Sequence, residues 1–484
     1  MEKGDLKEKT VFGMMWGAIG KVGTLTINFI TNLVLARLLM PEDFGAIAML
    51  AIFLAVSSSF IQGGLGSALV QKKNPEHIDY STVFYWNLSV AALFYLIIFV
   101  SAPFIADYYA LPLVKPLLRV QSVVLIIQSF SYVQYTQLQK QMNFKALSIR
   151  NLAAALAGTL VAIPLALKGF GPWSLVASAI IASVVNVLLL WKMSSWRPAW
   201  EFSFTSLKTL FSFGGLILLS SLAETLYTNV QGLIIGKRCS AGDLGYFSQA
   251  KKLEEIPVMG LSQIVNDVTF PAFASLQDDR ERLLAGVRKS TKALSFLNFP
   301  MMILLMIIAH PLIYLLYGSK WEPSAPYFQI LCISGLIYTV NTLNMNVIKS
   351  LGKGKIYFVI QISERLMGIA LIIFGMKFGI YGLLWAVASV AYISFIINSF
   401  VNKKLINYGF FRQLGDIGVC LLIAAFTGAL TYGVGLLFSF HPVLIMLIQI
   451  AIYLSLYILI AKILKMEELD TYFSTLTNII HRKK

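Results

Sequence analysis

Polar and charged side chains recur at helical spacing within the first long apolar stretch of the chain, residues 13–36. Four of them lie three or four residues apart and therefore share one helix face: Lys21, Thr24, Asn28 and Asn32. Lys21 lies about 12 Å inside the stretch, at a rise of ~1.5 Å per residue. An ammonium group at that depth is costly in lipid, so it should face a protein interior or a wet cavity. Hydrogen bonding between helices does not require a charge, so Lys21 predicts a functional site. Asn28, on the same face, is a further candidate cavity residue, although as a neutral group it could equally join helices by hydrogen bonds.

A matching polar stripe occurs in a second apolar stretch, residues 213–236. Its members share the same helical spacing: Ser221, Glu224, Thr228 and Gln231. Glu224 holds nearly the position that Lys21 holds in the first stretch, counted from Gly214 and Gly13 respectively. We expect Glu224 to be a coupling or gating carboxylate, because an attraction present in only one conformation could bias a conformational change.

The stretch 246–275 carries the densest charge of any apolar window. Lys251 and Lys252 are candidate ligand-binding cations, although Glu254 and Glu255 are close enough for local helical ion pairing to satisfy them. Asp267, further along, is a second candidate for coupling.

Two other windows also contain charged groups. Arg119 lies in the window 116–138, and the neighbours Glu364 and Arg365 lie in the middle of the window 356–376. We regard Arg119 and Arg365 as candidate cavity residues and Glu364 as a candidate coupling residue; a buried Glu364–Arg365 pair is the alternative. Neutral polar residues of the windows could line a cavity or join helices by hydrogen bonds: Ser59, Gln62, Gln128, Tyr132 and Tyr135.

Metal, disulfide and nucleotide chemistry find no support in the sequence. The three cysteines and four histidines are far apart, without the paired spacing of a metal site. Gly63-Gly-Leu-Gly66 follows no strand and lies in an apolar window, so it predicts close helix packing and not a phosphate-binding loop. We therefore expect no cofactor.

These residues must be positioned by helices in a membrane. Of the 484 residues, 57% are hydrophobic and 13% are charged, about half the charged share of soluble domains. Windows of about twenty apolar residues are long enough to cross a bilayer. The remaining windows are near 44–70, 82–105, 146–167, 172–191, 296–317, 327–348, 380–401, 417–438 and 442–463. The sequence predicts an all-α polytopic membrane protein with about 14 transmembrane helices.

The distribution of basic residues predicts the orientation. With the N-terminus in the cytoplasm, the cytoplasmic segments hold 27 Lys and Arg residues and the opposite segments hold 7. Both termini are thus expected in the cytoplasm. The basic residues of the cytoplasmic loops then account for the net charge of +16. This charge therefore does not indicate a nucleic-acid partner, and we expect none.

The chain resembles itself at an offset of about 200 residues. Leu33-Val-Leu-Ala-Arg37 with Asp43-Phe-Gly45 matches Leu233-Ile-Ile-Gly-Lys237 with Asp243-Leu-Gly245. An offset of six spans keeps the direction of each helix, so the halves should be parallel repeats around a central cavity. We expect an N-lobe at 1–195, an interfacial linker helix at 196–212, a C-lobe at 213–402, and two further spans with a cytoplasmic tail at 403–484.

Two motifs give the chain a family resemblance. Leu35-Ala-Arg-Leu-Leu-Met-Pro-Glu-Asp-Phe-Gly45 and Gly64-Leu-Gly-Ser-Ala-Leu-Val-Gln71, together with the two lobes, resemble polysaccharide flippases. These belong to the multidrug/oligosaccharidyl-lipid/polysaccharide exporter superfamily, in the branch named for colanic-acid export. The resemblance implies a non-enzymatic flippase of the bacterial inner membrane. Its cargo would be an undecaprenyl-diphosphate-linked oligosaccharide, moved to the periplasmic leaflet by alternating access.

The same resemblance implies a cationic central cavity, with Lys21 and Lys251 or Lys252 on its helices and Arg119 and Arg365 as further members. Transport could be coupled to H+, Na+ or the membrane potential. Membrane lipids, a polysaccharide polymerase and glycosyltransferases are the expected partners. Two alternatives stay open: a multidrug exporter of the same superfamily, which would favour acidic cavity residues, and a membrane-embedded polymerase or acyltransferase.

Overall fold

A computed structural model describes residues 3–437, 441–472 and 474, and within these residues every regular element is a helix. The last ten residues of the expected cytoplasmic tail, 475–484, lie outside the described part. The chain divides into two compact units, unit 1 at Met1–Gly245 and unit 2 at Tyr246–Lys484. Each unit is described by itself below.

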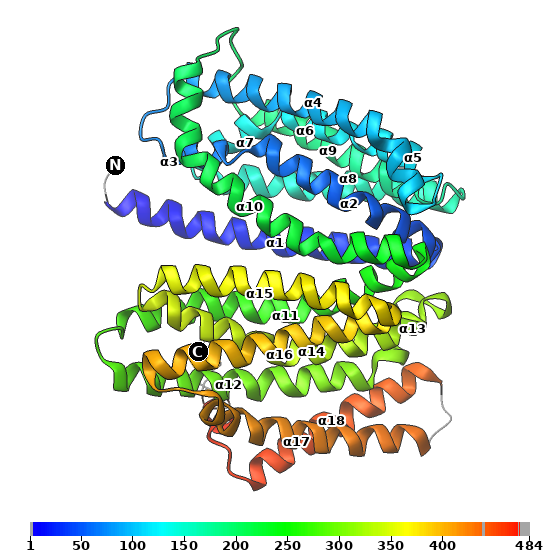
Figure 1. The fold of residues 1–484 in the computed structure, drawn as a ribbon, viewed down its shortest axis with the longest axis vertical. Helices are drawn as coiled ribbons and strands as arrows, with labels where there is room; N and C mark the ends of the chain where they lie inside the picture. Colours follow the sequence, from blue (N-terminus) through cyan, green and yellow to red (C-terminus); the bar gives the residue numbers. More distant parts are fainter. Residues whose placement is uncertain (1–2, 438–440, 473, 475–484) are drawn as a thin grey trace. The chain divides into compact units, whose positions relative to one another are not determined.

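Unit 1 contains ten complete helices and the start of an eleventh (Figure 1). They are α1 (Lys3–Leu38), α2 (Pro41–Gln62), α3 (Leu65–Gln71), α4 (His77–Tyr109), α5 (Val114–Gln121), α6 (Val123–Ser129), α7 (Tyr132–Lys140), α8 (Phe144–Leu167), α9 (Trp173–Met193), α10 (Phe204–Arg238) and α11 (Ala241–Ser275).

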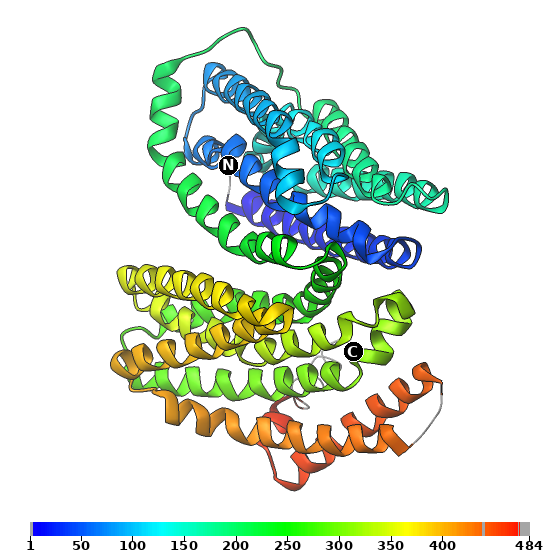
Figure 2. The ribbon, with the colours of Figure 1, turned by 45° about the vertical axis from the view of Figure 1, so that its right-hand side comes forward.

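Unit 2 contains the rest of α11 and the remaining helices, of which α12, α14 and α16 run side by side in both ribbon views (Figure 2). They are α12 (Arg280–Ile307), α13 (Ala309–Tyr317), η1 (Ser319–Trp321), α14 (Ser324–Ser350), α15 (Gly354–Gly375), η2 (Met376–Phe378), α16 (Gly379–Ile406), α17 (Phe410–Leu437) and α18 (Pro442–Ile463).

The helices confirm an all-helical polytopic membrane protein. Among the described residues, 11 helical stretches are long and apolar enough to cross a membrane, or 12 if the pair α5–α6 and α7, bent by 43°, forms one span. Two features separate this count from the expected fourteen windows. The stretch Gly354–Ile406 counts once but contains two helices, α15 and α16, and α11 is long enough but too polar to be included.

Segments that the charge distribution places on one side of the membrane gather at one end of unit 1. The Lys140 ammonium donates to the Leu69 carbonyl (3.1 Å), and a His77 ring nitrogen lies 3.0 Å from the Arg197 carbonyl oxygen. At the other end, the Lys237 ammonium donates to the Tyr108 carbonyl (2.5 Å). The alternation of loops within unit 1 therefore agrees with the sequence, while the assignment of one end to the cytoplasm stays a prediction.

The repeated motifs form two matching helix corners, α1–α2 and α10–α11, both within unit 1. The Asp43 carboxylate accepts a hydrogen bond from the Met40 N–H (2.9 Å), and the Asp243 carboxylate accepts one from the Ser240 N–H (3.1 Å). Equivalent residues thus cap equivalent helix starts.

The two corners also contact each other through equivalent glycines. A Cβ atom at Gly45 would overlap the Ala241 carbonyl oxygen, and one at Gly245 would overlap the Pro41 carbonyl oxygen. Only glycine permits this close approach of the two backbones.

The segment between the expected lobes differs from the prediction of a separate helix at 196–212. Residues 194–203 are not helical, and α10 runs without a break from Phe204, where the Ser203 hydroxyl accepts the Ser206 N–H (3.2 Å). The helical periodicity of residues 204–211 belongs to the first turns of α10. Since α10 packs against α2, α3 and α4, unit 1 ends later than the expected N-lobe. The lobe boundaries themselves stay a prediction.

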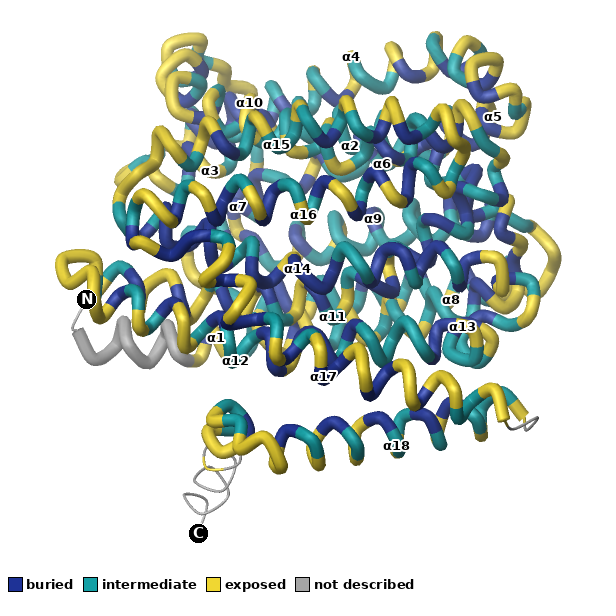
Figure 3. The backbone as a smooth tube through the Cα atoms, turned by 60° about the horizontal axis from the view of Figure 1, so that its bottom comes forward, coloured by how far each residue is buried: buried dark blue, intermediate teal, exposed yellow. Residues whose placement is uncertain are grey.

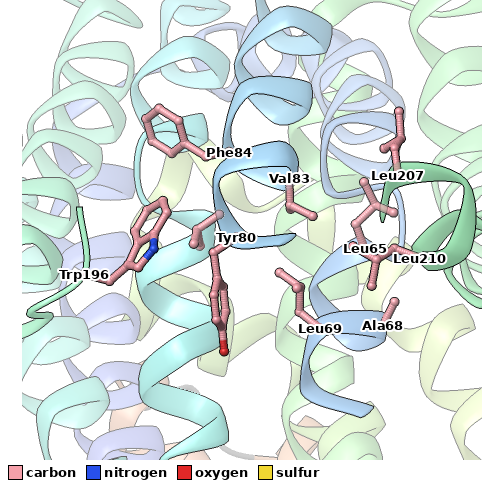
Figure 4. Packing of buried hydrophobic residues seen from close by; sticks show 10 residues of the cluster. Leu65, Ala68, Leu69, Tyr80, Val83, Phe84, Trp196, Leu207 and Leu210 are labelled. Atoms are coloured by element: carbon pink, nitrogen blue, oxygen red, sulfur yellow. The ribbon is translucent and has the colours of Figure 1, made fainter. Parts of the chain in front are cut away.

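A hydrophobic cluster packs residues 194–203 and the start of α10 against the rest of unit 1 (Figure 4). Its buried members come from α3, α4, α7, the segment before α10 and α10 itself: Leu65, Ala68, Leu69, Tyr80, Val83, Phe84, Val133, Trp196, Leu207 and Leu210. The backbone of the segment is held as well, because the Ser203 N–H donates to the Thr82 hydroxyl (3.0 Å). The start of α10 is therefore an integral part of unit 1.

Burial varies strongly among the helices (Figure 3). In α14, 72% of the most apolar window is buried within the protein, whereas the figure is 17% in α4. A helix that is apolar all round and mostly covered lies inside a bundle, and an uncovered one faces lipid. Thus α14 is the central helix of unit 2, and α4 lies at the surface of unit 1.

Candidate functional site

A cavity of about 520 Å³ lies inside unit 1, and we call it the amide cavity. Its size falls within the range of about 300–1,000 Å³ that is typical of small-molecule sites. The polar residues lining it come from α2, α3, α4, the α6–α7 region, α8, α9 and α10: Ser58, Ser59, Gln62, Ser67, Asn87, Gln128, Ser131, Tyr132, Tyr135, Thr136, Gln139, Arg150, Asn186 and Ser221.

Helix breaks shape the amide cavity. Between α2 and α3, Gly63 and Gly64 have φ angles of +55° and +68°, which most side chains disfavour. A Cβ atom at Gly64 would also overlap the Gly214 carbonyl oxygen of α10. The prediction that the glycine-rich motif serves close helix packing is therefore confirmed, and Gly66 of the same motif lines the cavity.

Hydroxyl and amide groups form a loose hydrogen-bond chain along the cavity wall. The Gln62 amide donates to the Ser58 hydroxyl (3.2 Å), and the Gln128 amide donates to the Ser183 hydroxyl (3.2 Å). The Tyr132 hydroxyl lies 3.4 Å from both the Ser58 hydroxyl and the Gln128 carbonyl oxygen. Bonds of this length are weak, so these groups could exchange partners with a ligand at little cost.

Other polar atoms at the cavity have no partner among the described residues. They are Asn87 Oδ1, Asn186 Oδ1 and Arg150 Nε, all of which are buried. Asn87 is only 2% exposed. A buried polar group without a hydrogen bond costs about 1–3 kcal/mol, and since these three atoms have almost no accessible surface they lie within the cavity wall.

Arg150 is the one charged residue among those described as lining the amide cavity. It lies near the start of α8, with its guanidinium carbon 5.1 Å from the centre of the Tyr135 ring. The guanidinium also donates to the Asn151 side-chain oxygen. Within the described part of the chain, no carboxylate pairs with Arg150. The cavity therefore presents a positive charge that no carboxylate of the described residues neutralises.

A second pocket of about 310 Å³ adjoins the amide cavity and contains Lys21; we call it the lysine pocket. Lys21 and Thr24 of α1 line one side, Ser148 and Asn151 of α8 line another, and Tyr135 and Gln139 border both this pocket and the amide cavity. The Lys21 ammonium has no salt-bridge partner in the described regions.

Close packing of α1 on α8 fixes the position of Lys21. A Cβ atom at Gly20, the preceding residue, would overlap the Ser148 hydroxyl, and that hydroxyl donates to the Trp16 carbonyl (2.7 Å). Further along the same helices, the hydroxyls of Thr31 and Thr159 lie 2.6 Å apart. The face of α1 that packs against α8 thus lies directly beside the polar face that the sequence predicts.

The other predicted cavity cations line neither pocket. The Arg119 N–H donates to the Phe99 carbonyl (3.1 Å), with its guanidinium over the Phe99 ring. Lys251, Lys252 and Arg365 belong to unit 2. Asn28 is exposed on α1 beyond the lysine pocket. Their roles in substrate binding stay predictions.

The predicted coupling carboxylates have separate surroundings. Glu224 is exposed on α10, one turn after Ser221, which lines the amide cavity. Asp267 accepts two hydrogen bonds from the Gln263 amide (3.0 and 3.1 Å) on its own helix, and Glu364 accepts one from the Asn398 amide (3.0 Å).

Sequence reasoning missed the residues that make the amide cavity distinctive. It counted Arg150 among the loop cations, because Arg150 lies close to the start of its apolar stretch. Asn87 and Asn186 are amides within apolar helices, and that signal alone could have found them. Ser59, Gln62, Gln128, Tyr132 and Tyr135, noted in the sequence as polar, do line the cavity together.

Comparisons with known proteins place this geometry in context. A family model described as "Polysaccharide biosynthesis protein" matches residues 34–326. The succinoglycan biosynthesis transport protein ExoT of Rhizobium meliloti (strain 1021) is 31% identical over 345 residues, covering 71% of this chain and 69% of that protein. The lipopolysaccharide biosynthesis protein WzxC of Escherichia coli (strain K12) is 26% identical over 415 residues, covering 84% of each chain.

Solved structures share the fold at low sequence identity. The lipid II flippase MurJ in an inward closed conformation has a TM-score of 0.73 at 15% identity, covering 93% of this chain and 99% of that one. An inward-facing multidrug resistance transporter of the MATE family in the MOP superfamily has a TM-score of 0.59 at 14% identity, covering 79% of this chain and 95% of that one. These likenesses concern the fold alone.

Proposed function

Since the chain belongs to the family of polysaccharide biosynthesis proteins, we propose that it is a flippase for the lipid-linked repeat unit of a bacterial surface polysaccharide. It is a multi-pass membrane transport protein of polysaccharide biosynthesis and not an enzyme. The proposed cargo is an undecaprenyl-diphosphate-linked oligosaccharide, moved from the cytoplasmic to the periplasmic leaflet by alternating access.

The observation that carries this proposal is the pair of adjoining pockets in unit 1. The lysine pocket offers an anionic head group an ammonium that has no salt-bridge partner among the described residues, and the amide cavity offers hydroxyls and amides to sugar hydroxyls. A diphosphate with an attached saccharide combines these two chemistries in one molecule. Lys21 is the proposed contact for the diphosphate, as a compact point charge suits phosphate oxygens.

The same pockets disfavour the alternative of a multidrug exporter. Binding a cationic drug would require a carboxylate or another anionic group near the ligand. Among the described residues that line the two pockets, none is acidic, and both charged ones are cations, Lys21 and Arg150.

Several features of the sequence reading remain part of the proposal. The protein would lie in the bacterial inner membrane with both termini in the cytoplasm, and its halves would act as two lobes related by the internal repeat. Glu224 would couple transport to H+, Na+ or the membrane potential, with Asp267 and Glu364 as further candidates. A polymerase and glycosyltransferases would be the partners that consume and supply the cargo.

The proposal is tested with the purified chain in liposomes that contain a fluorescent diphosphate-linked oligosaccharide in one leaflet. We expect the protein to accelerate its passage to the other leaflet. Lys21→Ala should abolish the acceleration, Lys21→Arg should retain part of it, and Lys404→Ala, an exposed lysine at the end of α16, is the matched control. Passage at the rate of protein-free liposomes, or transport of a cationic dye instead, would refute the proposal.

A further inference from the structure

We propose that residues 196–204, between α9 and the first turn of α10, anchor unit 1 among the phospholipid headgroups of one leaflet, with Trp200 as the central anchor. We call these residues the strap. The leaflet is the one on the side that the charge distribution assigns to the cytoplasm. The proposal goes beyond the transport function and does not depend on the cargo, because it assigns an interaction surface and names a lipid surface as its partner.

The strap is held against the first turns of α4. The Ala199 N–H donates to the Ser81 hydroxyl (3.3 Å). The Ser203 N–H donates to the Thr82 hydroxyl (3.0 Å). Between α9 and these bonds, Trp196 is buried in the hydrophobic cluster of unit 1 (Figure 4). The strap therefore has a fixed position on α4, although most of it is not helical.

The other aromatic side chains of the strap point away from the protein. Trp200 is 96% exposed, Phe202 is 42% exposed and Phe204 is 79% exposed. The rings of Phe202 and Phe204 pack edge to face, with their centres 5.0 Å apart. Exposed apolar groups that lie together mark a surface for a protein partner or for a membrane. The depth of Trp200 decides between these two.

The position of Trp200 along α4 gives this depth. Its ring stacks on that of Tyr85, with the ring centres 5.6 Å apart and the planes 22° from parallel. Tyr85 follows the first residue of α4, His77, by about 12 Å along the helix axis. With 33 residues, α4 is about 50 Å long, so a hydrocarbon core of about 30 Å centred on it leaves about 10 Å at each end. Trp200 therefore lies at the boundary between headgroups and hydrocarbon.

Beyond this aromatic pair, the same side of α4 faces lipid. Leu96 and Val100 share the side of α4 that carries Tyr85, and both are exposed. Tryptophan prefers the membrane interface, because its ring is apolar and its N–H is polar. The strap thus extends the lipid-facing surface of α4 towards the headgroups. A soluble protein could contact Trp200 at this level only by displacing lipid.

The anchor acts on the start of α10. The strap leads without a gap into this helix at Phe204, and Ser221 further along α10 lines the amide cavity. Anchoring the strap fixes the first turn of α10 at the membrane surface. A movement of α10 would then pivot about this end of the helix.

Quenching of Trp200 fluorescence by brominated phospholipids tests the depth, in the purified full-length chain in nanodiscs. The chain has eight tryptophans, so the signal of Trp200 is the difference between the wild type and Trp200→Phe. Lipids brominated next to the headgroup should remove most of this signal, and lipids brominated at the end of the acyl chain should remove less. Stronger quenching by the deep bromines, or quenching by aqueous iodide alone, would overturn the proposal.

A photo-reactive benzoylphenylalanine in place of Phe204 identifies the partner in cells. We expect covalent adducts with phospholipid after illumination, detected by mass spectrometry of the purified chain. The same group in place of Arg282, an exposed residue in the first turn of α12, is the matched control and should form no lipid adduct. An adduct with another protein at position 204, in place of the lipid adduct, would overturn the proposal.

Trp200→Ser tests whether Trp200 is the central anchor. Because the Trp200 side chain is almost fully exposed, its loss removes little packing and the variant should fold. We expect the lipid adduct at position 204 to fall several-fold in this variant. Phe411→Ser is the control, since Phe411 is a similarly exposed aromatic residue at the start of α17, and it should leave the adduct unchanged. An adduct that is as abundant in Trp200→Ser as in the parent would refute the anchor.

Discussion

The interiors of the two units place their amide side chains differently. In unit 1, amide groups line a cavity of about 520 Å³. In unit 2, amides bond to one another: Asn344 donates to Gln413 (2.9 Å), and Asn402 donates to Asn344 (2.8 Å). The central helix α14 carries Asn344 and is mostly buried.

The same contrast holds for arginine. In unit 2, the Arg288 guanidinium donates two hydrogen bonds of 2.8 Å to the Asp416 carboxylate, which also accepts one from the Tyr408 hydroxyl (3.0 Å). In unit 1, no carboxylate within the described part pairs with Arg150. Around Asn344 and Asp416, unit 2 thus joins its polar side chains to one another, which suits a rigid scaffold, whereas unit 1 places amides and an arginine at a cavity.

The strongest test of this contrast removes the centre of the amide network in unit 2. Gln413 accepts from Asn344 and Ser399 and donates to Asn344 and the Tyr408 carbonyl, at 2.9–3.1 Å. Gln413→Leu should lower the free energy of unfolding by about 3 kcal/mol, because buried partners lose their hydrogen bonds. The midpoint of unfolding in detergent measures this. A loss below about 0.5 kcal/mol would mean that the network is not a scaffold.

A smaller loss in the free energy of unfolding is expected when Asp416, the partner of Arg288, loses its charge. Asp416→Asn keeps the shape but removes the charge-assisted bonds, and 49% of the Arg288 side chain is exposed. We expect a loss of about 1 kcal/mol, because exposure to solvent weakens the pair. The loss should shrink further in 1 M salt, where the Debye length is only about 3 Å. A loss that grows with salt would contradict this explanation.

The matched substitution in unit 1 should hardly change stability. Asn87→Leu removes an amide whose buried oxygen already lacks a hydrogen bond, so the free energy of unfolding should change by less than about 0.5 kcal/mol. Transport in the liposome assay should nevertheless fall. If Asn87→Leu destabilises the protein as much as Gln413→Leu does, the two interiors do not differ in the way described.

The smallest expected effect concerns Cys239, next to the α10–α11 corner. Burial, helped by the nearby Asp243 charge, raises the pKa of its thiol to about 11. The thiol therefore stays protonated at neutral pH, and its alkylation should be slow and rise about tenfold per pH unit towards pH 11. Mass spectrometry of the wild type, with Cys239→Ser as the control, measures this rate. Fast labelling at pH 7 would show that the corner is more open.

Hydropathy and charge were sufficient to predict the membrane-spanning helices and the alternation of loops within unit 1, because both depend on composition over about twenty residues. The structure differs from the predicted separate linker helix at 196–212, because a helix that continues and a separate short helix have the same periodicity. The position of Arg150 could not be predicted, because it depends on the rotation of α8 and on the breaks after Gln62 and Ser129. Lys21 was found because a charge deep in an apolar stretch needs no knowledge of its neighbours.

The contact between the helix corners α1–α2 and α10–α11 limits which residues the sequence can carry there. Each of Gly45 and Gly245 is constrained by the backbone of the other copy of the motif, Ala241 and Pro41 respectively. After an internal duplication, neither copy could accept a side chain there unless the other backbone moved away. A saturation mutagenesis scan should therefore record two short intolerant windows, two hundred positions apart, in which even alanine is rejected.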